Sequence, residues 1–218
     1  MKDKLYIYIG SLALLVSFFI IGSHFYKKSQ GEQFEQVVDA NKNVFVREHS
    51  PRFGDPKAEV IITEFLDPEC ESCRAAYPGV KELLKEYEGK VQLVVRFAPF
   101  HANSKHAIKV LNATRKQNKF WESLEHLFYY QKVWADHHNP KPEMVYKLLP
   151  KVGVDIEKLK EDMKDPSLDK LIEQDLEDLR MLNVKATPTF FVNGKPLEDY
   201  GLKFLQDLVK AEVSRIYN

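Results

Sequence analysis

Two cysteines, Cys70 and Cys73, lie between a strand-like run of residues and a helix-like run. Residues 58–66 (AEVIITEFL) are rich in β-branched and aromatic side chains, which favours a buried strand. Residues 70–88 carry apolar side chains along one stripe and stop before a glycine, which predicts a helix, and residues 91–97 (VQLVVRF) predict a second strand. Because parallel neighbouring strands need a crossover connection, this order predicts a βαβ unit with the cysteines at its strand-to-helix junction.

The rest of the chain continues an α/β pattern that a helical block interrupts. Residues 103–182 have helical spacing and predict three or four helices. Residues 189–192 (TFFV) predict a strand, Asn193–Gly194 a two-residue hairpin turn, and residues 195–197 the returning strand. A last helix over about 200–216 closes the predicted order of βαβ, helical block and ββα.

The first thirty residues differ in character from the rest. No charged residue occurs from Leu5 to Ile21, which is close to the roughly 20 residues that a helix needs to cross a bilayer. We therefore expect an N-terminal transmembrane helix, with the long C-terminal domain outside the cytoplasm. A cleavable signal peptide is the alternative, but the residues after Ile21 (GSH) end in a bulky ring rather than in the small residue of a cleavage site.

A polar stretch follows this expected anchor. It contains a short apolar alternation at Val44 and Val46, which predicts an edge strand, and turn-forming residues at 50–56 mark the start of the compact domain. The predicted organisation is a membrane anchor (1–27), a stalk and edge strand (28–50), a βαβ half (51–102), a helical insertion (103–182) and a ββα half (183–218).

Overall charge excludes one class of partner. The chain has 32 Lys and Arg residues and 32 Asp and Glu residues, so its formal net charge is zero. Proteins that bind nucleic acid normally present a basic field. We therefore expect no nucleic-acid partner.

The two cysteines form a single CxxC motif, which leaves no thiol for a structural disulfide elsewhere. Thiol exchange needs a thiolate, and a free cysteine with a pKa of about 8.5 is mostly protonated at neutral pH. A helix N-terminus stabilises a thiolate at Cys70, and Cys73 lies one turn further on the same face, close enough to resolve a mixed disulfide. The motif therefore predicts a redox-active disulfide between Cys70 and Cys73 and no other cofactor.

A zinc site is the alternative interpretation of the cysteine pair. A closed zinc site usually takes four ligands, and this chain has no second CxxC pair. Histidines would have to complete the site, from the set His101, His106, His126, His137 and His138. A run such as His137–His138 is more typical of a solvated loop or helix end, so we predict no metal.

These features together resemble the thioredoxin superfamily, and specifically its DsbA-like branch, in which a helical domain is inserted between the βαβ and ββα halves. The resemblance covers roughly residues 44–216 and rests on the CxxC motif at the strand-to-helix junction and on Thr187–Pro188 just before a predicted strand. It implies an α/β thioredoxin-like fold with a cis-proline beside the cysteines. It also implies that Thr187 and Pro188 line the groove for substrate peptides.

The resemblance extends to an acid, Glu64, six residues before Cys70 on the predicted strand. Ile62 and Leu66 share its parity and are apolar, which indicates that the Glu64 side chain points to a buried face. A buried carboxyl group has a raised pKa. The resemblance implies that this group takes and returns the proton of Cys73.

The two residues between the cysteines depart from the familiar members of the superfamily. Thioredoxin has Gly-Pro there and the strongly oxidising DsbA has Pro-His, whereas this chain has Glu71 and Ser72. With Asp67 and Glu69 also close, negative charge is expected to raise the pKa of Cys70 relative to a histidine-containing motif, which makes a weaker oxidant. The direction of electron flow therefore stays open.

We predict a thiol–disulfide oxidoreductase that acts on thiol-containing protein substrates and is recycled by a membrane or soluble redox partner. Disulfide formation or isomerisation needs an oxidising compartment, so we expect the domain on the periplasmic side of the inner membrane, held by a single-pass anchor. The alternatives are a thiol reductase for cytochrome or metal-site assembly, and a metal-binding or metallochaperone module that uses the same cysteines.

Overall fold

The computed structural model describes residues 14–23, 25, 42–136, 139–197 and 199–218. The chain divides into two compact units, residues 1–42 and residues 43–218. In the first unit, residues 14–23 are helical. Residues 5–13 of the predicted membrane span lie outside the described residues, and no helix within the described ranges is long and apolar enough to cross a membrane.

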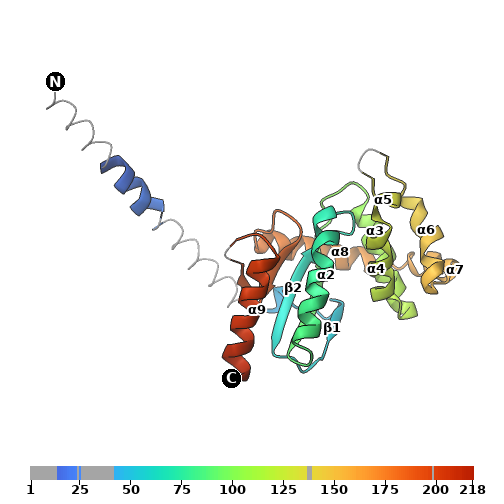
Figure 1. Cartoon of the computed structure of the whole chain (residues 1–218). Coiled ribbons are helices and arrows are strands. Elements are labelled where there is room, and N and C mark those ends of the chain that lie inside the picture. The colour runs from blue at the N-terminus through green and yellow to red at the C-terminus, as the bar shows by residue number, and fades with distance from the viewer. Residues whose placement is uncertain (1–13, 24, 26–41, 137–138, 198) are drawn as a thin grey trace. The chain divides into compact units, whose positions relative to one another are not determined.

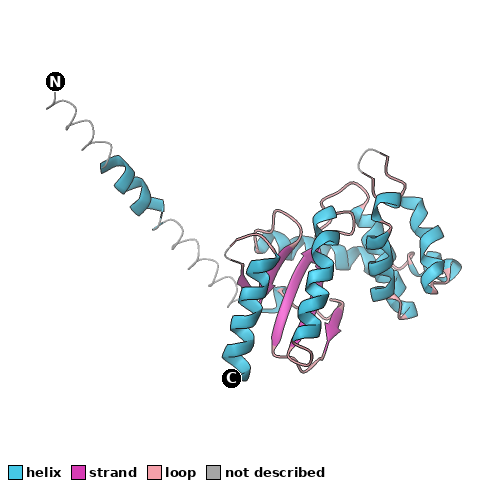
Figure 2. Cartoon of the chain, viewed as in Figure 1, coloured by secondary structure: helices cyan, strands magenta, loops and turns pink. Residues whose placement is uncertain are grey.

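The second unit is built on a mixed five-stranded sheet with the strand order β1-β3-β2-β4-β5. Figure 1 labels β1 and β2 in this sheet, and Figure 2 colours the strands magenta. The central strands β2 and β3 are parallel, whereas every other neighbouring pair is antiparallel. The strands are β1 (Arg52–Gly54), β2 (Val60–Leu66), β3 (Val91–Phe97), β4 (Thr189–Val192) and β5 (Lys195–Pro196).

Helix α2 (Glu71–Glu86) joins β2 to β3, which confirms the predicted βαβ unit. Helix α9 (Leu202–Tyr217) lies beside α2 on the sheet, and the two helices contact each other (Figure 1). The core between them and the sheet is apolar because alternate strand residues such as Ile62 meet the buried stripes of the helices, for example Leu83 and Val209.

The opposite face of the sheet carries the side chains of Phe65 and Arg96, which are directly paired on the neighbouring strands β2 and β3. Arg96 is fully buried, and its guanidinium Nη2 lies 2.6 Å from Asp175 Oδ1 and 2.5 Å from Asp178 Oδ2. Both carboxylates belong to helix α8 (Ser167–Met181), which packs on β3. The buried guanidinium of Arg96 therefore explains why the face of α8 that packs on the sheet carries two aspartates.

The predicted helical insertion is confirmed between β3 and β4. The described residues there form six α-helices rather than the predicted three or four. Prolines at the starts of two 3₁₀ turns and the left-handed Gly153 (φ 85°) divide residues 142–153 into short pieces. In addition to α8, the elements are α3 (Ser104–Thr114), η2 (Arg115–Gln117), α4 (Phe120–Tyr129), α5 (Gln131–Trp134), η3 (Pro142–Met144), α6 (Val145–Leu148), η4 (Leu149–Val152) and α7 (Ile156–Asp162).

The hairpin turn between β4 and β5 is confirmed. Asn193 and Gly194 both have positive φ, 50° and 79°, as a two-residue turn between right-twisted strands requires. The side-chain oxygen of Asn193 also accepts the backbone N–H of Ile61 at 2.8 Å, which ties the turn to β2.

The edge strand predicted around Val44 and Val46 is wrong. Lys42–Val44 forms a 3₁₀ turn, η1, and the edge strand is β1, within the stretch that the sequence predicts as a turn. Strand β1 forms because its backbone pairs with the outer edge of β3, and a Cβ at Gly54 would lie 2.8 Å from the Val91 carbonyl oxygen. Tertiary pairing, rather than apolar alternation, decides where this strand lies.

Candidate active site

The cysteine pair lies where β2 ends and α2 begins. Cys70 is the N-cap of α2, with extended backbone angles (φ −71°, ψ 121°), and Cys73 lies in the first turn. The backbone N–H of Cys70 donates to the carbonyl of Asp67 at 3.0 Å, which closes the loop between strand and helix. Both cysteines are free thiols, with Cys70 8% exposed and Cys73 0% exposed. Cys70 is therefore the more accessible sulfur.

The surroundings of Cys70 favour its thiolate. Its pKa is lowered to about 5, chiefly because the Cys73 thiol hydrogen-bonds to its sulfur. Thr187 and the backbone N–H groups of Cys73 and Ser72 act in the same direction, against the opposing effect of burial. The Cys73 thiol and the two backbone N–H groups are donors that stabilise negative charge at the start of a helix, where the helix dipole also favours an anion. Cys70 is a thiolate at neutral pH.

The two sulfurs have opposite acid–base character. The pKa of Cys73 is raised far above its ordinary value by burial first, and then by its bond to Cys70 and by the charge of Glu64. The backbone N–H of Asp67 lies 3.5 Å from the Cys73 sulfur. Cys73 therefore keeps its proton while Cys70 gives its proton up.

Glu64 lies on β2 with its side chain 0% exposed, as its parity with Ile62 and Leu66 predicts. Among the described residues, neither carboxylate oxygen has a hydrogen-bond partner. Burial, followed by the charge of Cys70, raises the pKa of Glu64 to about 8. A carboxyl group with this pKa exchanges its proton near neutral pH.

The loop before β4 meets the cysteine pair. The Thr187–Pro188 peptide bond is cis, and the Cys70 sulfur lies 3.2 Å from the carbonyl oxygen of Thr187, to which it donates only in its protonated form. These two residues are 117 positions apart in sequence. The tertiary fold thus places Thr187 and Pro188 beside Cys70, as expected from the resemblance.

The sequence predicts that neighbouring acids raise the pKa of Cys70 relative to a histidine-containing motif, and this comparison stays a prediction. Relative to an ordinary cysteine, the pKa of Cys70 is lowered. The buried carboxylates of Asp67 and Glu69 are turned toward the start of α3, where both contact the Ser104 hydroxyl, at 2.5 Å and 3.0 Å. Glu71, like Ser72, is exposed on the first turn of α2. The acids next to the motif therefore hold the loop together.

His101 belongs to the same network, although the sequence gives it no role. Its ring Nδ1 lies 2.8 Å from Asp67 Oδ2, and the backbone N–H groups of Phe100 and His101 donate to that same oxygen. Desolvation opposes the charge of the ring, but Asp67 and the nearby Cys70 raise the pKa of His101 overall. The sequence indicates only that His101 follows the end of β3 by four residues, and this position alone does not identify a histidine that belongs to the site.

The sequence matches the protein family described as Thioredoxin over residues 47–211, a span that contains all five strands and the cysteine pair. The chain belongs to the thioredoxin family. Among solved structures, it is similar to a thioredoxin-like oxidoreductase from Silicibacter pomeroyi DSS-3, with 26% identity and a TM-score of 0.68 over 79% of this chain and 96% of that one.

The DsbA-like arrangement is confirmed by a second solved structure. The thiol-disulfide exchange protein α-DsbA2 from Wolbachia pipientis matches with a TM-score of 0.71 and 21% identity, over 84% of this chain and 98% of that one. A match over 84% of this chain cannot leave out the whole of residues 103–182, so it includes inserted helices of this chain as well as its two thioredoxin halves. The predicted α/β class with a helical insertion is therefore correct for this thioredoxin-family chain.

The curated relatives are much longer proteins. The chain is 28% identical over 144 residues to the Na(+)/H(+) antiporter NhaA of Herminiimonas arsenicoxydans, which is 66% of this chain and 22% of the antiporter. The chain thus spans about a fifth of the length of the curated relatives it matches. The similarity concerns one domain-sized part of the antiporter.

The zinc interpretation gains no support from the site of this thioredoxin-family chain. Within the described ranges, no group of three or more His, Cys, Asp or Glu side chains is placed to hold a metal ion. His101 is bonded to Asp67, and the ring of His106 lies 3.2 Å from the Tyr146 hydroxyl. His137 and His138 lie outside the described residues.

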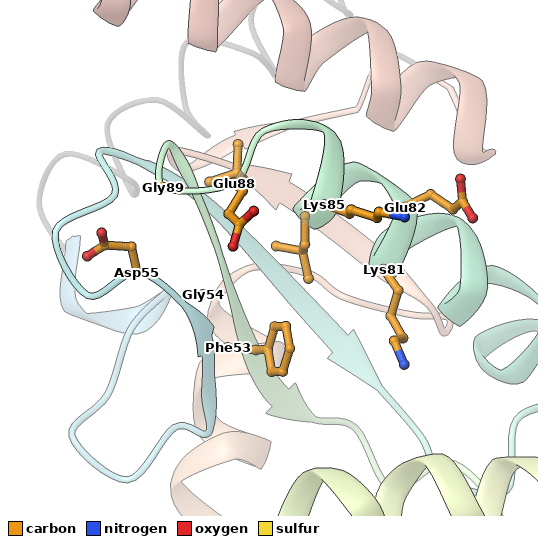
Figure 3. Close-up of a pocket in the computed structure, with 10 residues that line it drawn as sticks. Phe53, Gly54, Asp55, Lys81, Glu82, Lys85, Glu88 and Gly89 are labelled. Carbon is orange, nitrogen blue, oxygen red and sulfur yellow. The ribbon is translucent and has the colours of Figure 1, made fainter.

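A separate surface pocket of about 640 Å³ lies near the other end of α2 (Figure 3). Leu84, Lys85 and Glu88 line it from the helix and the turn that follows, and Phe53 lines it from β1. Helix α2 has 16 residues, so its two ends are about 24 Å apart. This pocket is therefore not part of the cysteine site.

Proposed function

We propose that the protein is a thiol–disulfide oxidoreductase that acts on protein substrates. Cys70 is the sulfur that exchanges with the substrate, and Cys73 is its disulfide partner, which resolves the mixed disulfide when the exchange runs in reverse. The observation that carries the proposal is the contrast between the two thiols, because Cys70 has a pKa of about 5 while the adjacent Cys73 is buried and protonated. A low pKa at one cysteine and a high pKa at the other allow a CxxC pair to react with substrate through the first sulfur and to re-form the intramolecular disulfide through the second.

In the oxidised form, a substrate thiolate attacks Cys70 Sγ, the Cys70–Cys73 bond breaks, and its electron pair leaves on Cys73. Glu64 gives Cys73 its proton, since the buried sulfur strongly favours the neutral thiol. A second substrate thiolate then attacks the substrate sulfur of the mixed disulfide, and Cys70 leaves as a thiolate. Two substrate thiolates become one disulfide, and the cysteine pair gains two electrons.

The low pKa of Cys70 favours the oxidising direction. A stabilised thiolate stabilises the reduced form of the pair, which raises the reduction potential, and it also makes Cys70 a better leaving group. The proposed activity is therefore disulfide formation or isomerisation rather than reduction.

Thr187 and Pro188 are proposed to contact the substrate. The Thr187 carbonyl oxygen lies 3.2 Å from the Cys70 sulfur, close to the position that the substrate sulfur must reach. Extended peptides bind exposed backbone beside a reactive group through main-chain hydrogen bonds. The loop before β4 would thus hold the substrate segment next to Cys70 Sγ.

We also propose that residues 1–27 anchor the domain to the inner membrane and that the domain works on the extracytoplasmic side. The uncharged run from Leu5 to Ile21 and the need of disulfide chemistry for an oxidising compartment support this placement. Retention of the full chain in membranes after alkaline carbonate extraction, and release of a chain without residues 1–27, is the expected result. Release of both chains would refute the anchor.

A redox titration of the full chain against glutathione tests the proposed activity. We expect a potential between about −120 and −180 mV, the range of oxidants and isomerases, and a value near −270 mV would instead indicate a reductant. If Cys70 and Cys73 form no disulfide at any glutathione ratio, the redox function is refuted.

A further inference from the structure

One side chain of the helical insertion reaches the cysteine loop directly. Gln131, the first residue of α5, is 1% exposed, and its side-chain Nε2 donates to the carbonyl of Pro68 at 2.8 Å and to the carbonyl of Cys70 at 3.0 Å. One amide group therefore bonds to the backbone on both sides of Glu69. Gln131 is 61 positions from Cys70, so the contact exists only in the folded protein.

Burying the Gln131 amide is energetically unfavourable, because only one end of the amide has hydrogen-bond partners among the described residues. Within the described part of the chain, the other polar atom of the side chain, Oε1, is buried without a hydrogen-bond partner. An unsatisfied buried acceptor is unfavourable, so ordinary packing would favour an apolar side chain at this position. The favourable contribution of Gln131 is the pair of hydrogen bonds that its Nε2 group donates to the carbonyls of Pro68 and Cys70.

The carbonyl that Gln131 binds belongs to the residue that carries the exchanging sulfur. The Cys70 carbonyl also accepts the backbone N–H of Arg74 at 3.2 Å, as the first intrahelical bond of α2. An N-cap residue must keep extended backbone angles for its side chain to face the free N–H groups of the first turn. A second bond to the same carbonyl limits rotation of the Cys70 peptide group.

We propose that Gln131 is a positioning residue, which holds the Pro68–Cys70 loop so that the Cys70 sulfur faces the backbone N–H groups of Ser72 and Cys73. This inference rests on the proposed oxidoreductase function. It gives the helical insertion a direct part in setting the reactivity of the cysteine pair, since the bond comes from α5 and not from the thioredoxin halves. The Gln131 amide donates to the carbonyls of Pro68 and Cys70, and not to Glu64, His101 or Thr187, which are the other groups near Cys70.

The test compares Gln131→Met, which keeps the side-chain length but has no N–H donor, with Asn112→Leu. Asn112 is another buried amide of the insertion, and its Nδ2 donates to the carbonyl of Ile108 in its own helix. Both variants lose a buried amide, but only one loses contact with the cysteine loop. The thiolate fraction of the full chain is followed by ultraviolet absorbance against pH, and the equilibrium with glutathione is measured in parallel.

We expect Gln131→Met to raise the pKa of Cys70 by about one unit and to make the pair about tenfold less oxidising against glutathione, which is about 30 mV. Asn112→Leu is expected to change neither value. Gln131→Asn, whose amide is one carbon too short to reach both carbonyls, is expected to act in the same direction and serves if Gln131→Met does not fold.

An unchanged pKa and equilibrium in folded Gln131→Met or Gln131→Asn would overturn the role of Gln131 and leave the proposed function intact. Equal changes in Asn112→Leu would also overturn it, because the effect would then follow from general loosening of the insertion. A wild-type chain that never forms the Cys70–Cys73 disulfide would instead refute the proposed function itself.

Discussion

Replacing Glu64 with glutamine is expected to stabilise the protein at neutral pH. The folded-state pKa of Glu64 is about 8 and its ordinary value is 4.5, so the folded protein must keep this carboxyl group protonated at pH 7 whereas the unfolded chain releases the proton. Each pH unit above the ordinary value costs about 1.4 kcal/mol. The wild-type chain therefore loses about 3 kcal/mol at pH 7, a loss that a neutral amide of the same shape avoids.

The sign of the effect depends on pH in a defined way. Between pH 4.5 and pH 8 the folded protein binds more protons than the unfolded chain at this site, so the stability of the wild type falls as pH rises through that window. The advantage of Glu64→Gln should be near zero at pH 4.5, grow by about 1.4 kcal/mol per unit, and level off above pH 8.

Guanidinium denaturation of the reduced protein at several pH values measures this difference. Glu82→Gln, at an exposed carboxylate on α2, controls for the loss of one negative charge. A difference between wild type and Glu64→Gln that does not change between pH 4.5 and pH 8 would refute the reasoning, since Glu64 would then not be held neutral by burial. The same variant should exchange disulfides more slowly, because an amide cannot pass a proton to Cys73.

Three further outcomes are expected. The rate at which iodoacetamide alkylates Cys70 should fall as pH is lowered through about 5, since the thiolate is then protonated, and a midpoint near the usual cysteine value would contradict the site electrostatics. Cys73→Ala should accumulate mixed disulfides with protein substrates on non-reducing gels while Cys70→Ser traps none; equal trapping would reverse the assigned roles. Arg96→Met should lower the free energy of unfolding by about 3–5 kcal/mol in urea denaturation, because it leaves Asp175 and Asp178 buried beside fewer cations; a loss below 1 kcal/mol would argue against this buried cluster.

Local spacing in the sequence is enough to place the reactive part of the site. The strand, the CxxC motif and the helix follow one another directly, and the parity of Glu64 with Ile62 predicts the buried acid that the structure shows. These features depend on residues at most a few turns apart. Periodicity therefore predicts them without knowledge of the fold.

Contacts between distant parts of the chain decided what the sequence could not. The acids Asp67 and Glu69 were predicted to oppose the Cys70 thiolate, yet their carboxylates bond to residues near the start of α3, more than thirty positions away. The role of an acid depends on where its oxygens point, and that direction is set by donors on another element. The sequence places these two acids close to the thiol, but it does not show which donors bind their carboxylates.

The sequence by itself thus determined the CxxC junction, the buried acid, the hairpin turn and the order of βαβ, helical insertion and ββα. Only the tertiary structure decided that β1 is the edge strand, that Thr187 meets Cys70 and that Gln131 binds the cysteine loop. The physical reason is that alternation and helical spacing in the sequence indicate which face of an element is buried. They do not indicate which other element that face contacts, because that depends on hydrogen bonds and packing between residues far apart in the chain.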